Sequence, residues 1–492
     1  MKPLTPIMLA GTGSDVGKSL IATGLCRIFM QDGYHPAPFK AQNMALNSYV
    51  TPDGLEIGRA QAVQAEAAGV ACCSDMNPIL LKPSGENMSQ VVLNGRPIGN
   101  RHACEYFRKE GREDLRDAVH QAFDRLAGRY NPIVMEGAGS IAEINLRDSD
   151  LVNMPMARYA GADVILVADI DRGGVFASVY GSIMLQPEAD RARINGIIIN
   201  KFRGDMRLFE SGRRMIEDIC CVPVLGVVPY AADIHIEEED SVALAAKCSG
   251  VSAGKINMAV VLVPHISNFT DFDAIERDPR VNLFYTSDAE ELHESDIIII
   301  PGSKATLADL QYMRRRGIAS AIVRCRRAGK TVMGICGGYQ MMGIEVCDPE
   351  GVEGDIPRLP GLGLLPVRTT LAKDKVTRRV SFSFRGSDRQ CAGYEIHMGR
   401  TVLDCDASPL NMIDGSVPEG CMADDRCFGT YIHGILDNQQ VIDYLLSPYL
   451  DKTDAVQVDY AAYKEEQYDA LAALLRKHID IARLYKIMGR DD

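Results

Sequence analysis

The start of the chain holds the run that most limits its possible folds, Ile7 to Ser19 (IMLAGTGSDVGKS). Ile7 to Ala10 have the continuous apolar character of a parallel strand that is covered on both faces. The glycines that follow let backbone N–H groups turn toward an anion, and the next helix presents its positive end to that anion. This order of strand, glycine-rich loop and helix predicts a phosphate-binding loop and hence a protein that uses a nucleotide.

The loop departs by one residue from the usual spacing. Thr12 stands where the first glycine of the pattern normally lies, and Gly11 comes one residue earlier. Lys18 is placed to reach the outer phosphates and Ser19 to bind Mg²⁺ through its hydroxyl. The alternative, a glycine-rich turn that binds nothing, is disfavoured by the helical spacing of apolar residues after the loop. The predicted nucleotide-binding residues are Gly11, Thr12, Gly13, Ser14, Asp15, Val16, Gly17, Lys18 and Ser19.

Length and composition limit the class of protein. A chain of 492 residues is too long for one core, and domains of roughly 150 residues predict two or three. A formal charge of −13 disfavours nucleic acid or an anionic membrane as a partner. We find no signal segment and no apolar run of the roughly 18 residues that a membrane span needs, so we expect a cytoplasmic protein. The 14 cysteines form no C-x-x-C pair and are expected to be reduced.

Apolar strands alternate with helices over the first half, which predicts a parallel sheet covered by helices. Ligands of such sheets bind at the carboxyl ends of the strands. Lys40 ends one strand, before the polar segment AQNMALNSYVTPDG, and Glu136 ends another, before GAGS. Glu136 is predicted to hold Mg²⁺, with a structural salt bridge as the alternative. The expected strands are 35–40, 133–135, 164–168, 197–199 and 224–228, with helices at 56–69 and 112–128 and a domain boundary near residue 250.

A second α/β unit is expected after that boundary, with strands at 258–263, 297–300 and 331–335 and a helix at 319–328. Cys336 follows the last strand in GICGGYQMMG, at a glycine-flanked turn into a helix. Such a turn exposes a side chain in a strained position where a helix N-terminus favours a thiolate, so Cys336 is a predicted nucleophile. His433 is its predicted base and His397 a weaker candidate, and backbone N–H groups near Gly302 and Gly337 are expected to stabilise an oxyanion. Residues 446–492 are expected to be a helical tail that packs on the second domain.

With both halves in view, the chain resembles the glutamine-hydrolysing cobyric acid synthases of the cobalamin pathway over nearly its whole length. The segments that carry the resemblance are GTGSDVGKS, PFKAQNMALNSYVT, NPILLKPSGENMSQVV, EGAGS, DIDRGGVFAS, SNFTDFD, GICGGYQMMG, GYEIHMG and YIHGIL. FKAQNMALNSYVT favours this family over the cobyrinic acid a,c-diamide synthases, which share its architecture. The resemblance implies a P-loop NTPase-like parallel-sheet domain over residues 1–250 and a class I glutamine amidotransferase-like α/β domain over residues 251–445.

The first half is also similar to dethiobiotin synthetase, whose phosphate loop has an extra residue too. This resemblance implies that Lys18 contacts the phosphates and that Ser19 and Glu136 bind Mg²⁺. It further implies Lys40 beside the reacting phosphoryl group and Asn200 on the adenine of ATP. Candidates for the substrate and phosphoryl site are Lys40, Asn43 and Lys82, the last two from segments that carry the resemblance.

The second half resembles triad glutamine amidotransferases, in which cysteine attacks the glutamine amide and histidine moves the proton. Most of these enzymes carry a glutamate two residues after the histidine, a position that Ile435 occupies here. The residue that orients His433 is therefore open, and Glu395 and Asp437 are the candidates.

The resemblance implies ATP- and Mg²⁺-dependent amidation of a small corrinoid, adenosylcobyrinic acid a,c-diamide, through acyl phosphates and ammonia from glutamine. Four carboxylates, b, d, e and g, would be amidated to give adenosylcobyric acid. The alternatives are a cobyrinic acid a,c-diamide synthase, another ATP-dependent carboxylate amidotransferase, a P-loop ATPase switch, and a binding protein with an inactive glutaminase domain. The order of amidations, the oligomeric state and the ammonia route stay open at this stage.

Overall fold

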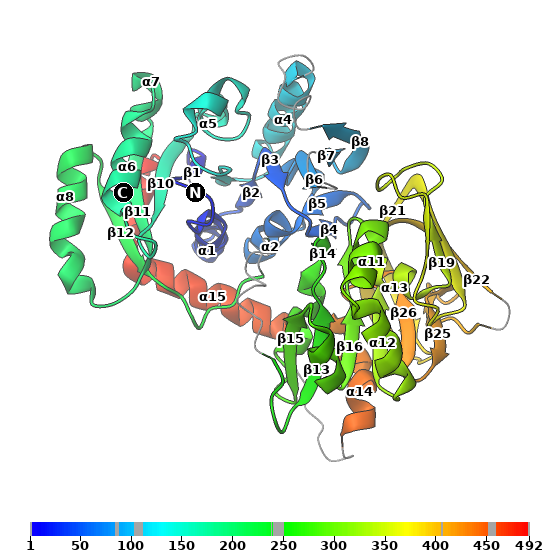
Figure 1. The fold of residues 1–492 in the computed structure, drawn as a ribbon. Helices are drawn as coiled ribbons and strands as arrows, with labels where there is room; N and C mark the ends of the chain where they lie inside the picture. The colour runs from blue at the N-terminus through cyan, green and yellow to red at the C-terminus, as the bar shows by residue number, and fades with distance from the viewer. Residues whose placement is uncertain are drawn as a thin grey trace.

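The computed structural model describes residues 2–83, 88–102, 112–237, 239, 250–404, 407–450 and 459–490 of the chain. Figure 1 shows two α/β domains, the first drawn from blue to green and the second from green to orange. Among the helices within these ranges, none combines the length and the apolar character that a membrane crossing requires. The boundary predicted near residue 250 adjoins residues 240–249, which lie outside the described ranges.

The first domain is built on six parallel strands in the order β12-β11-β10-β1-β9-β2. They are β1 (Ile7–Gly11), β2 (Ala37–Phe39), β9 (Ile133–Glu136), β10 (Asp163–Asp169), β11 (Ile194–Phe202) and β12 (Val224–Pro229). Each expected strand of the first half coincides with one of these, so the predicted parallel sheet is confirmed. Because β1 lies inside the sheet, the loop after it opens at the middle of the carboxyl edge.

Helices cover both faces of this sheet, as the strand sequence predicts. Ile7 and Leu9 of β1 share a core with α1 (Lys18–Gln31), whereas Met8 and Ala10 share one with helices on the opposite face. The alternation follows from the two-residue period of a strand. The helices of the opposite face include α4 (Arg112–Ala127), α5 (Met154–Ala160), α6 (Val175–Met184) and α8 (Glu210–Cys220); shorter elements are η1 (Ser74–Met76), η2 (Ile144–Ser149), α7 (Glu188–Arg191) and η3 (Met206–Phe209).

The polar segment after Lys40 forms short strands, which its sequence did not indicate. β3 (Gln42–Met44) joins β6 (Ile79–Pro83), β7 (Met88–Leu93) and β8 (Arg96–His102) in a four-stranded sheet. β4 (Ser48–Val50) pairs with β5 (Glu56–Gly58), so the helix expected over 56–69 begins later, as α2 (Arg59–Ala67). β4 also contacts the long strands β21 (Val367–Phe384) and β22 (Gln390–Leu403) of the second domain, and it is therefore part of the interface.

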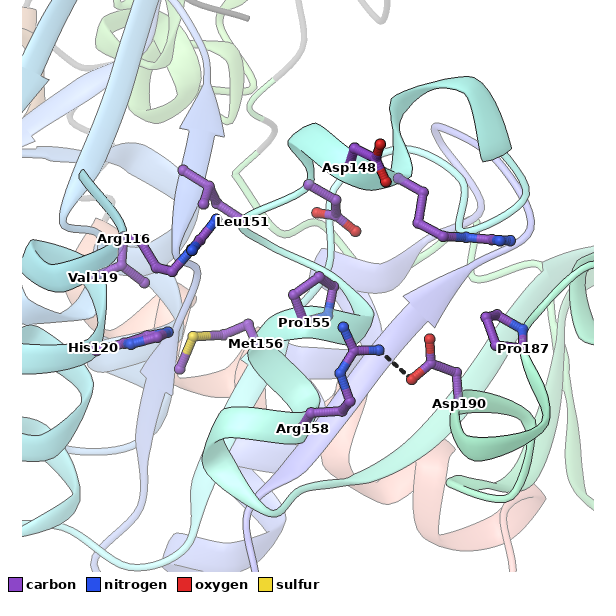
Figure 2. Close-up of a pocket in the computed structure, with 12 residues that line it drawn as sticks. Arg116, Val119, His120, Asp148, Leu151, Pro155, Met156, Arg158, Pro187 and Asp190 are labelled. Atoms are coloured by element: carbon purple, nitrogen blue, oxygen red, sulfur yellow. Dashed lines mark hydrogen bonds and ion pairs between the residues drawn. The ribbon is translucent and has the colours of Figure 1, made fainter. Parts of the chain in front are cut away.

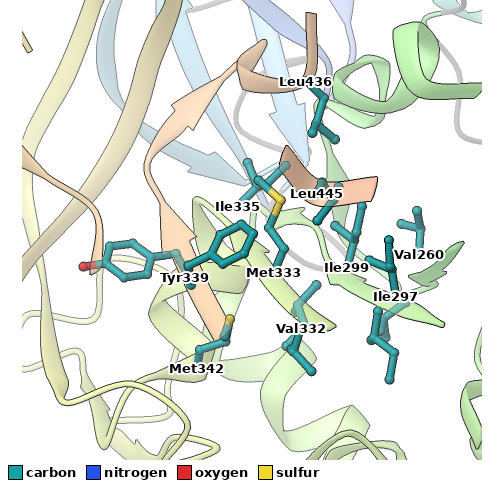
Figure 3. Close-up of a cluster of buried hydrophobic side chains, with 14 of the residues drawn as sticks. Val260, Ile297, Ile299, Val332, Met333, Ile335, Tyr339, Met342, Leu436 and Leu445 are labelled. Atoms are coloured by element: carbon teal, nitrogen blue, oxygen red, sulfur yellow. The ribbon is translucent and has the colours of Figure 1, made fainter. Parts of the chain in front are cut away.

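The second domain has a six-stranded sheet in the order β15-β13-β16-β18-β26-β25, parallel except for β25. Its strands are β13 (Ile256–Val261), β15 (Val281–Thr286), β16 (Ile297–Ile300), β18 (Thr331–Ile335), β25 (Cys421–Asp424) and β26 (Cys427–Thr430). Figure 3 shows part of its core, where Ile299 and Met333 of the central strands lie near Tyr339 of α13 (Gly337–Met342). The other helical elements are η5 (Phe269–Phe272), α9 (Asp273–Glu276), α10 (Ala289–Glu294), α11 (Thr306–Arg315), α12 (Ile318–Arg327), η6 (Ile435–Asp437), α14 (Gln439–Leu446) and η7 (Ser447–Tyr449).

A second sheet of this domain carries the predicted base. β21 and β22 form a long antiparallel hairpin, and the short strand β27 (Ile432–His433) pairs with β22. His433 therefore lies opposite Tyr394. The sheet also contains β19 (Glu345–Cys347), β20 (Arg358–Pro360), β23 (Asn411–Ile413) and β24 (Val417–Glu419), while β14 (Ile266–Ser267) and β17 (Gly302–Ser303) form a separate pair.

The expectation that the tail packs on the second domain is wrong for residues 459–490. Helix α15 (Tyr460–His478) lies along α1 of the first domain, and Ile479 forms a bridge with Gly226 of β12; α16 (Ile481–Ile487) follows. Figure 1 shows α15 in red beneath the first domain. The physical reason is an apolar stripe at helical spacing that packs on α1 and α2 of the first domain. The stripe consists of Tyr468, Leu471, Ala472 and Leu475.

Candidate active sites

The loop between β1 and α1 has the backbone that a phosphate site needs. Gly17, at the N-terminus of α1, has φ 92°, and a Cβ there would lie 2.1 Å from Nδ2 of Asn200. Glycine is therefore required on both counts. The ammonium of Lys18 donates to the carbonyl oxygens of Gly13 at 2.9 Å and Gly139 at 3.0 Å, which holds it across the mouth of the loop.

Three polar side chains beside this loop donate hydrogen bonds to the carboxylate of Glu136. Ser19 Oγ donates to its Oε1 at 2.9 Å and Lys40 Nζ to the same oxygen at 2.8 Å, while Gln64 Nε2 donates to Oε2 at 2.7 Å. Burial alone would raise the pKa of Glu136, but Lys40, Gln64 and Lys18 hold it below its ordinary value. The carboxylate is therefore ionised at neutral pH and lies against the Ser19 hydroxyl.

This pair of oxygens fits Mg²⁺, which prefers one or two hard protein ligands together with water and phosphate oxygens. Within the described ranges, no group of three or more His, Cys, Asp or Glu side chains could hold a metal ion alone. A site that shares its metal with a nucleotide is consistent with both observations. The alternative weighed for Glu136, a structural salt bridge, describes its present contact with Lys40 and does not conflict with a role in binding Mg²⁺.

Other residues predicted around the nucleotide lie close to the loop but have structural contacts of their own. Asn200 Nδ2 donates to the Val16 carbonyl oxygen at 2.9 Å, and the Thr12 N–H donates to that of Val167 at 3.0 Å. Asn43 Nδ2 donates to Gln61 Oε1 at 3.0 Å. The adenine contact of Asn200 and the substrate contact of Asn43 stay predictions.

Lys82 lies apart from the phosphate loop, at the interface of the two domains. Its ammonium donates to Ser48 Oγ at 2.8 Å and to Glu56 Oε1 at 2.9 Å, and Glu56 also pairs with Lys375 of β21. Lys82 lines the same cavity as Cys336. Its expected contact with the phosphoryl group stays a prediction.

Cys336 occupies the sharp turn that the sequence predicts, with φ 50° and ψ −108°. The turn packs so tightly that a Cβ on Gly338 would lie 1.9 Å from the carbonyl oxygen of Ile300, and one on Gly337 would lie 2.8 Å from the Ser303 nitrogen. A Cβ on Gly302 would lie 3.3 Å from the ring of His433. The side chain of Cys336 is 7% exposed, so it faces a narrow cavity rather than the open surface that the sequence suggested.

His433 faces this thiol and is oriented by Asp271. Its Nδ1 lies 2.7 Å from Asp271 Oδ2, its ring lines the same cavity as Cys336, and the N–H of Gly434 donates to Asp271 Oδ1 at 2.8 Å. Burial would lower the pKa of His433, but the charges of Asp271 and Cys336 outweigh it and raise that pKa to about 10. Cysteine, histidine and aspartate therefore form a triad in which Asp271 stabilises the charged form of His433.

Both predicted candidates for the orienting residue are wrong, because neither is the hydrogen-bond partner of His433. Glu395 pairs with Arg378, and the side chain of Asp437 is exposed. Asp271 lies in SNFTDFD, a segment that carried the family resemblance, but it is 162 positions from His433. No spacing in the sequence connects the two residues.

His397, the weaker candidate for the base, also lines the cavity, but its hydrogen-bond partner and its pKa differ from those of His433. Its Nδ1 lies 2.9 Å from the carbonyl oxygen of Gly399, and its ring stacks on Tyr431 at 3.8 Å. Burial lowers the pKa of His397 to about 4. A neutral ring without a carboxylate partner at hydrogen-bond distance is a poorer base than His433.

A larger hollow of about 430 Å³ lies on the first domain among α4, η2, α5 and α7 (Figure 2). Arg158 pairs with Asp190 at its edge, and Arg147 donates to the Leu185 carbonyl oxygen. None of the predicted site residues lines it. Arg147 and Arg158 are thus engaged in contacts that stabilise the fold, and the hollow is not part of either candidate site.

Comparisons with known proteins agree with this geometry. The family model for a CobQ/CobB/MinD/ParA nucleotide binding domain matches residues 7–242, and that for a CobB/CobQ-like glutamine amidotransferase domain matches residues 257–441. Cobyric acid synthases of Bacteroides fragilis strain YCH46 and Phocaeicola vulgatus are each 67% identical, covering 100% of both chains, and that of Parabacteroides distasonis is 55% identical over 98% of both. With relatives this similar over the full length, the chain belongs to the cobyric acid synthase family.

Proposed function

We propose that this protein uses ATP and glutamine to amidate the b, d, e and g carboxylates of adenosylcobyrinic acid a,c-diamide, which gives adenosylcobyric acid. The observation that carries the proposal is the presence of two complementary sites in one chain. One has a phosphate loop with Ser19 and Glu136, and the other has the Cys336–His433–Asp271 triad. The first suits activation of a carboxylate and the second suits release of ammonia. We further expect that the protein acts in the cytoplasm.

The first site supplies a leaving group, because a carboxylate does not react with ammonia at neutral pH. A substrate carboxylate oxygen attacks the γ-phosphorus of ATP, ADP leaves, and an acyl phosphate forms. Lys18 and Lys40 are placed to stabilise the phosphoryl oxygens, while Ser19 and Glu136 would hold Mg²⁺. When bound, Mg²⁺ supplies charge neutralisation on the phosphates. Ammonia then displaces inorganic phosphate and forms the amide.

The second site supplies the ammonia. The Cys336 thiolate attacks the side-chain amide carbon of glutamine, and the His433 imidazolium gives its proton to the departing nitrogen. Water then attacks the thioester, releases glutamate and returns the thiolate. Backbone N–H groups near Gly302 and Gly337 are our candidates for holding the oxyanion, since both glycines lie against the catalytic groups.

The cavity around Cys336 also has groups that suit an amino acid. Lys304 and Glu353 line it, and Glu353 Oε2 accepts a hydrogen bond from the Thr306 N–H at 2.6 Å. Burial raises the pKa of Glu353 to about 7 and lowers that of Lys304. In their charged forms the two match the ammonium and carboxylate of free glutamine. These two residues support glutamine as the nitrogen donor.

Product analysis tests the proposal directly. The purified protein is incubated with ATP, Mg²⁺, glutamine and either adenosylcobyrinic acid a,c-diamide or the acid without its two amides, and the products are analysed by mass spectrometry. We expect conversion of four carboxyl groups to amides with the diamide. Conversion of the a and c carboxylates of the unamidated acid would instead support a cobyrinic acid a,c-diamide synthase.

Cys336→Ala separates the two sites. It should abolish amidation from glutamine but leave amidation from added ammonium salts largely intact, because the first domain needs only ammonia and ATP. Loss of both activities in a folded variant would contradict this division of labour.

A further inference from the structure

Two asparagines without an assigned role meet at the interface of the domains. Asn47 precedes β4 in the first domain, and Asn268 precedes η5 in the second. Their contacts are reciprocal: the N–H of Phe269 donates to Asn47 Oδ1 at 3.2 Å, and the N–H of Ser48 donates to Asn268 Oδ1 at 2.9 Å. Both asparagines are buried, with 0% and 3% of their surface exposed. Each domain thus supplies a side-chain acceptor to the backbone of the other.

The second-domain half of this contact leads directly into the triad. Asn268 has φ 52°, a left-handed conformation that asparagine tolerates, and it turns the chain into η5. The N–H of Asp271 donates to the Asn268 carbonyl oxygen at 3.0 Å, so Asp271 lies within this turn. Because the Asp271 carboxylate holds both His433 Nδ1 and the Gly434 N–H, the position of the turn sets the position of the imidazole.

The first-domain half of the contact leads toward the phosphate loop. Asn47 Nδ2 donates to the Glu239 carbonyl oxygen at 3.2 Å, and Asn43 donates to the side chain of the same glutamate. Lys40, at the start of this segment, contacts Glu136. The segment 40–48 is therefore fixed at both ends, by groups of the phosphate site and by the turn that carries Asp271.

We propose that Asn47 and Asn268 are positioning residues through which the first domain completes the glutaminase site. The inference rests on the proposed function of Cys336 and His433. Asn268 lines the cavity around Cys336 and Asn47 does not. In the proposed role both asparagines hold the Asp271 turn in register with His433. When either side chain is removed, its hydrogen bond between the Asp271 turn and the first domain is lost, and we expect the imidazole to be held less firmly against Cys336.

The test measures glutamine hydrolysis by the full-length protein with Asn47→Ala and Asn47→Asp. Both variants lose the bond from Nδ2 to Glu239, but the aspartate keeps an oxygen that accepts from Phe269, so their difference isolates that acceptor. Misplacing a catalytic group costs up to roughly 100-fold in rate, and we expect kcat to fall about 10- to 100-fold in Asn47→Ala. Asn47→Asp should recover most of that loss.

Asn268→Gly provides the second arm, because glycine tolerates the same positive φ and removes the other acceptor. It should lower glutamine hydrolysis to a similar extent, while ammonia-dependent amidation persists as the control for folding. Arg379→Ala is the matched control for the interface. It removes a bond from Arg379 Nε to the Val50 carbonyl oxygen, also on β4, without touching the Asp271 turn.

Rates in Asn47→Ala and Asn268→Gly that stay within a few-fold of wild type would overturn the positioning role. An equal loss in Arg379→Ala, or no recovery in Asn47→Asp, would overturn it too, since general docking of the domains would then explain the effect. The wild-type protein separates this inference from the function on which it rests. If wild type itself fails to hydrolyse glutamine, the proposed function is what fails.

Discussion

Asp271→Asn tests the triad most directly, because it removes the charge beside His433 and leaves the size of the side chain almost unchanged. The aspartate has two acceptor oxygens, one facing His433 Nδ1 at 2.7 Å and one facing the Gly434 N–H at 2.8 Å. An amide has one acceptor oxygen and one donor nitrogen. The amide nitrogen therefore either faces the donating Gly434 N–H or faces His433 Nδ1, where it favours the neutral tautomer without a proton on Nδ1.

The magnitude follows from the charge and its burial. Unit charges about 4 Å apart interact by about 4 kcal/mol at an effective dielectric constant of about 20, which corresponds to about three units of pKa. Asp271 raises the pKa of His433, so its removal lowers that pKa and the imidazolium is lost at a lower pH. Together with the lost orientation of the ring, we expect kcat for glutamine hydrolysis to fall roughly 100- to 1,000-fold.

The assay is glutamate release at saturating glutamine, measured from neutral to alkaline pH. In addition to the lower rate, the alkaline limb of the profile should move to lower pH in Asp271→Asn. Asp437→Asn is the control, because Asp437 was a candidate from sequence but is exposed and makes no hydrogen bond with His433 in the described structure. A rate within a few-fold of wild type and an unmoved profile in Asp271→Asn would refute the triad.

Two further predictions concern the phosphate loop and the tail. Lys18→Ala should slow ammonia-dependent amidation on the order of 1,000-fold, because the lysine stabilises charge that develops on the phosphoryl group. Basal glutamine hydrolysis should survive. An amidation rate within a few-fold of wild type would exclude this loop from the reaction. Leu475→Ala should lower the free energy of unfolding by about 2–5 kcal/mol, because it leaves a cavity against α1. The measurement is the melting temperature of the protein, with Glu466→Ala, at an exposed position, as the control. Equal melting temperatures for Leu475→Ala and wild type would mean that the tail does not stabilise the first domain.

The sheets were predictable because buried parallel strands are apolar without interruption. Ile133 to Met135 and Val164 to Ala168 each read as such a strand, and β9 and β10 contain them. The glycine patterns predicted the two turns, because a phosphate loop and a cysteine elbow both need backbone conformations or close approaches that residues with a Cβ disfavour. The fold class and the positions of Lys18 and Cys336 could therefore be predicted from local sequence.

The elements that escaped prediction depend on contacts between distant parts of the chain. β3 is polar although it pairs with the apolar residues Ile79 to Leu81 of β6, and β4 pairs with β5 beside the second domain, so no local apolar pattern marks either strand. The stripe on α15 predicts an amphipathic helix but does not say which domain it covers. Its fit against Gly24, where a Cβ would lie 2.3 Å from Leu475, exists only in three dimensions.

Ile435 shows why the orienting carboxylate had to come from another element. Its side chain is 0% exposed and belongs to the core of the second domain. A glutamate there would bury an uncompensated charge among apolar groups, at a cost of several kcal/mol. Asp271 avoids that cost, because its carboxylate is neutralised by His433 and accepts the Gly434 N–H. The residue two places after the histidine is thus free to be apolar, and the triad depends on a turn that β4 of the first domain adjoins.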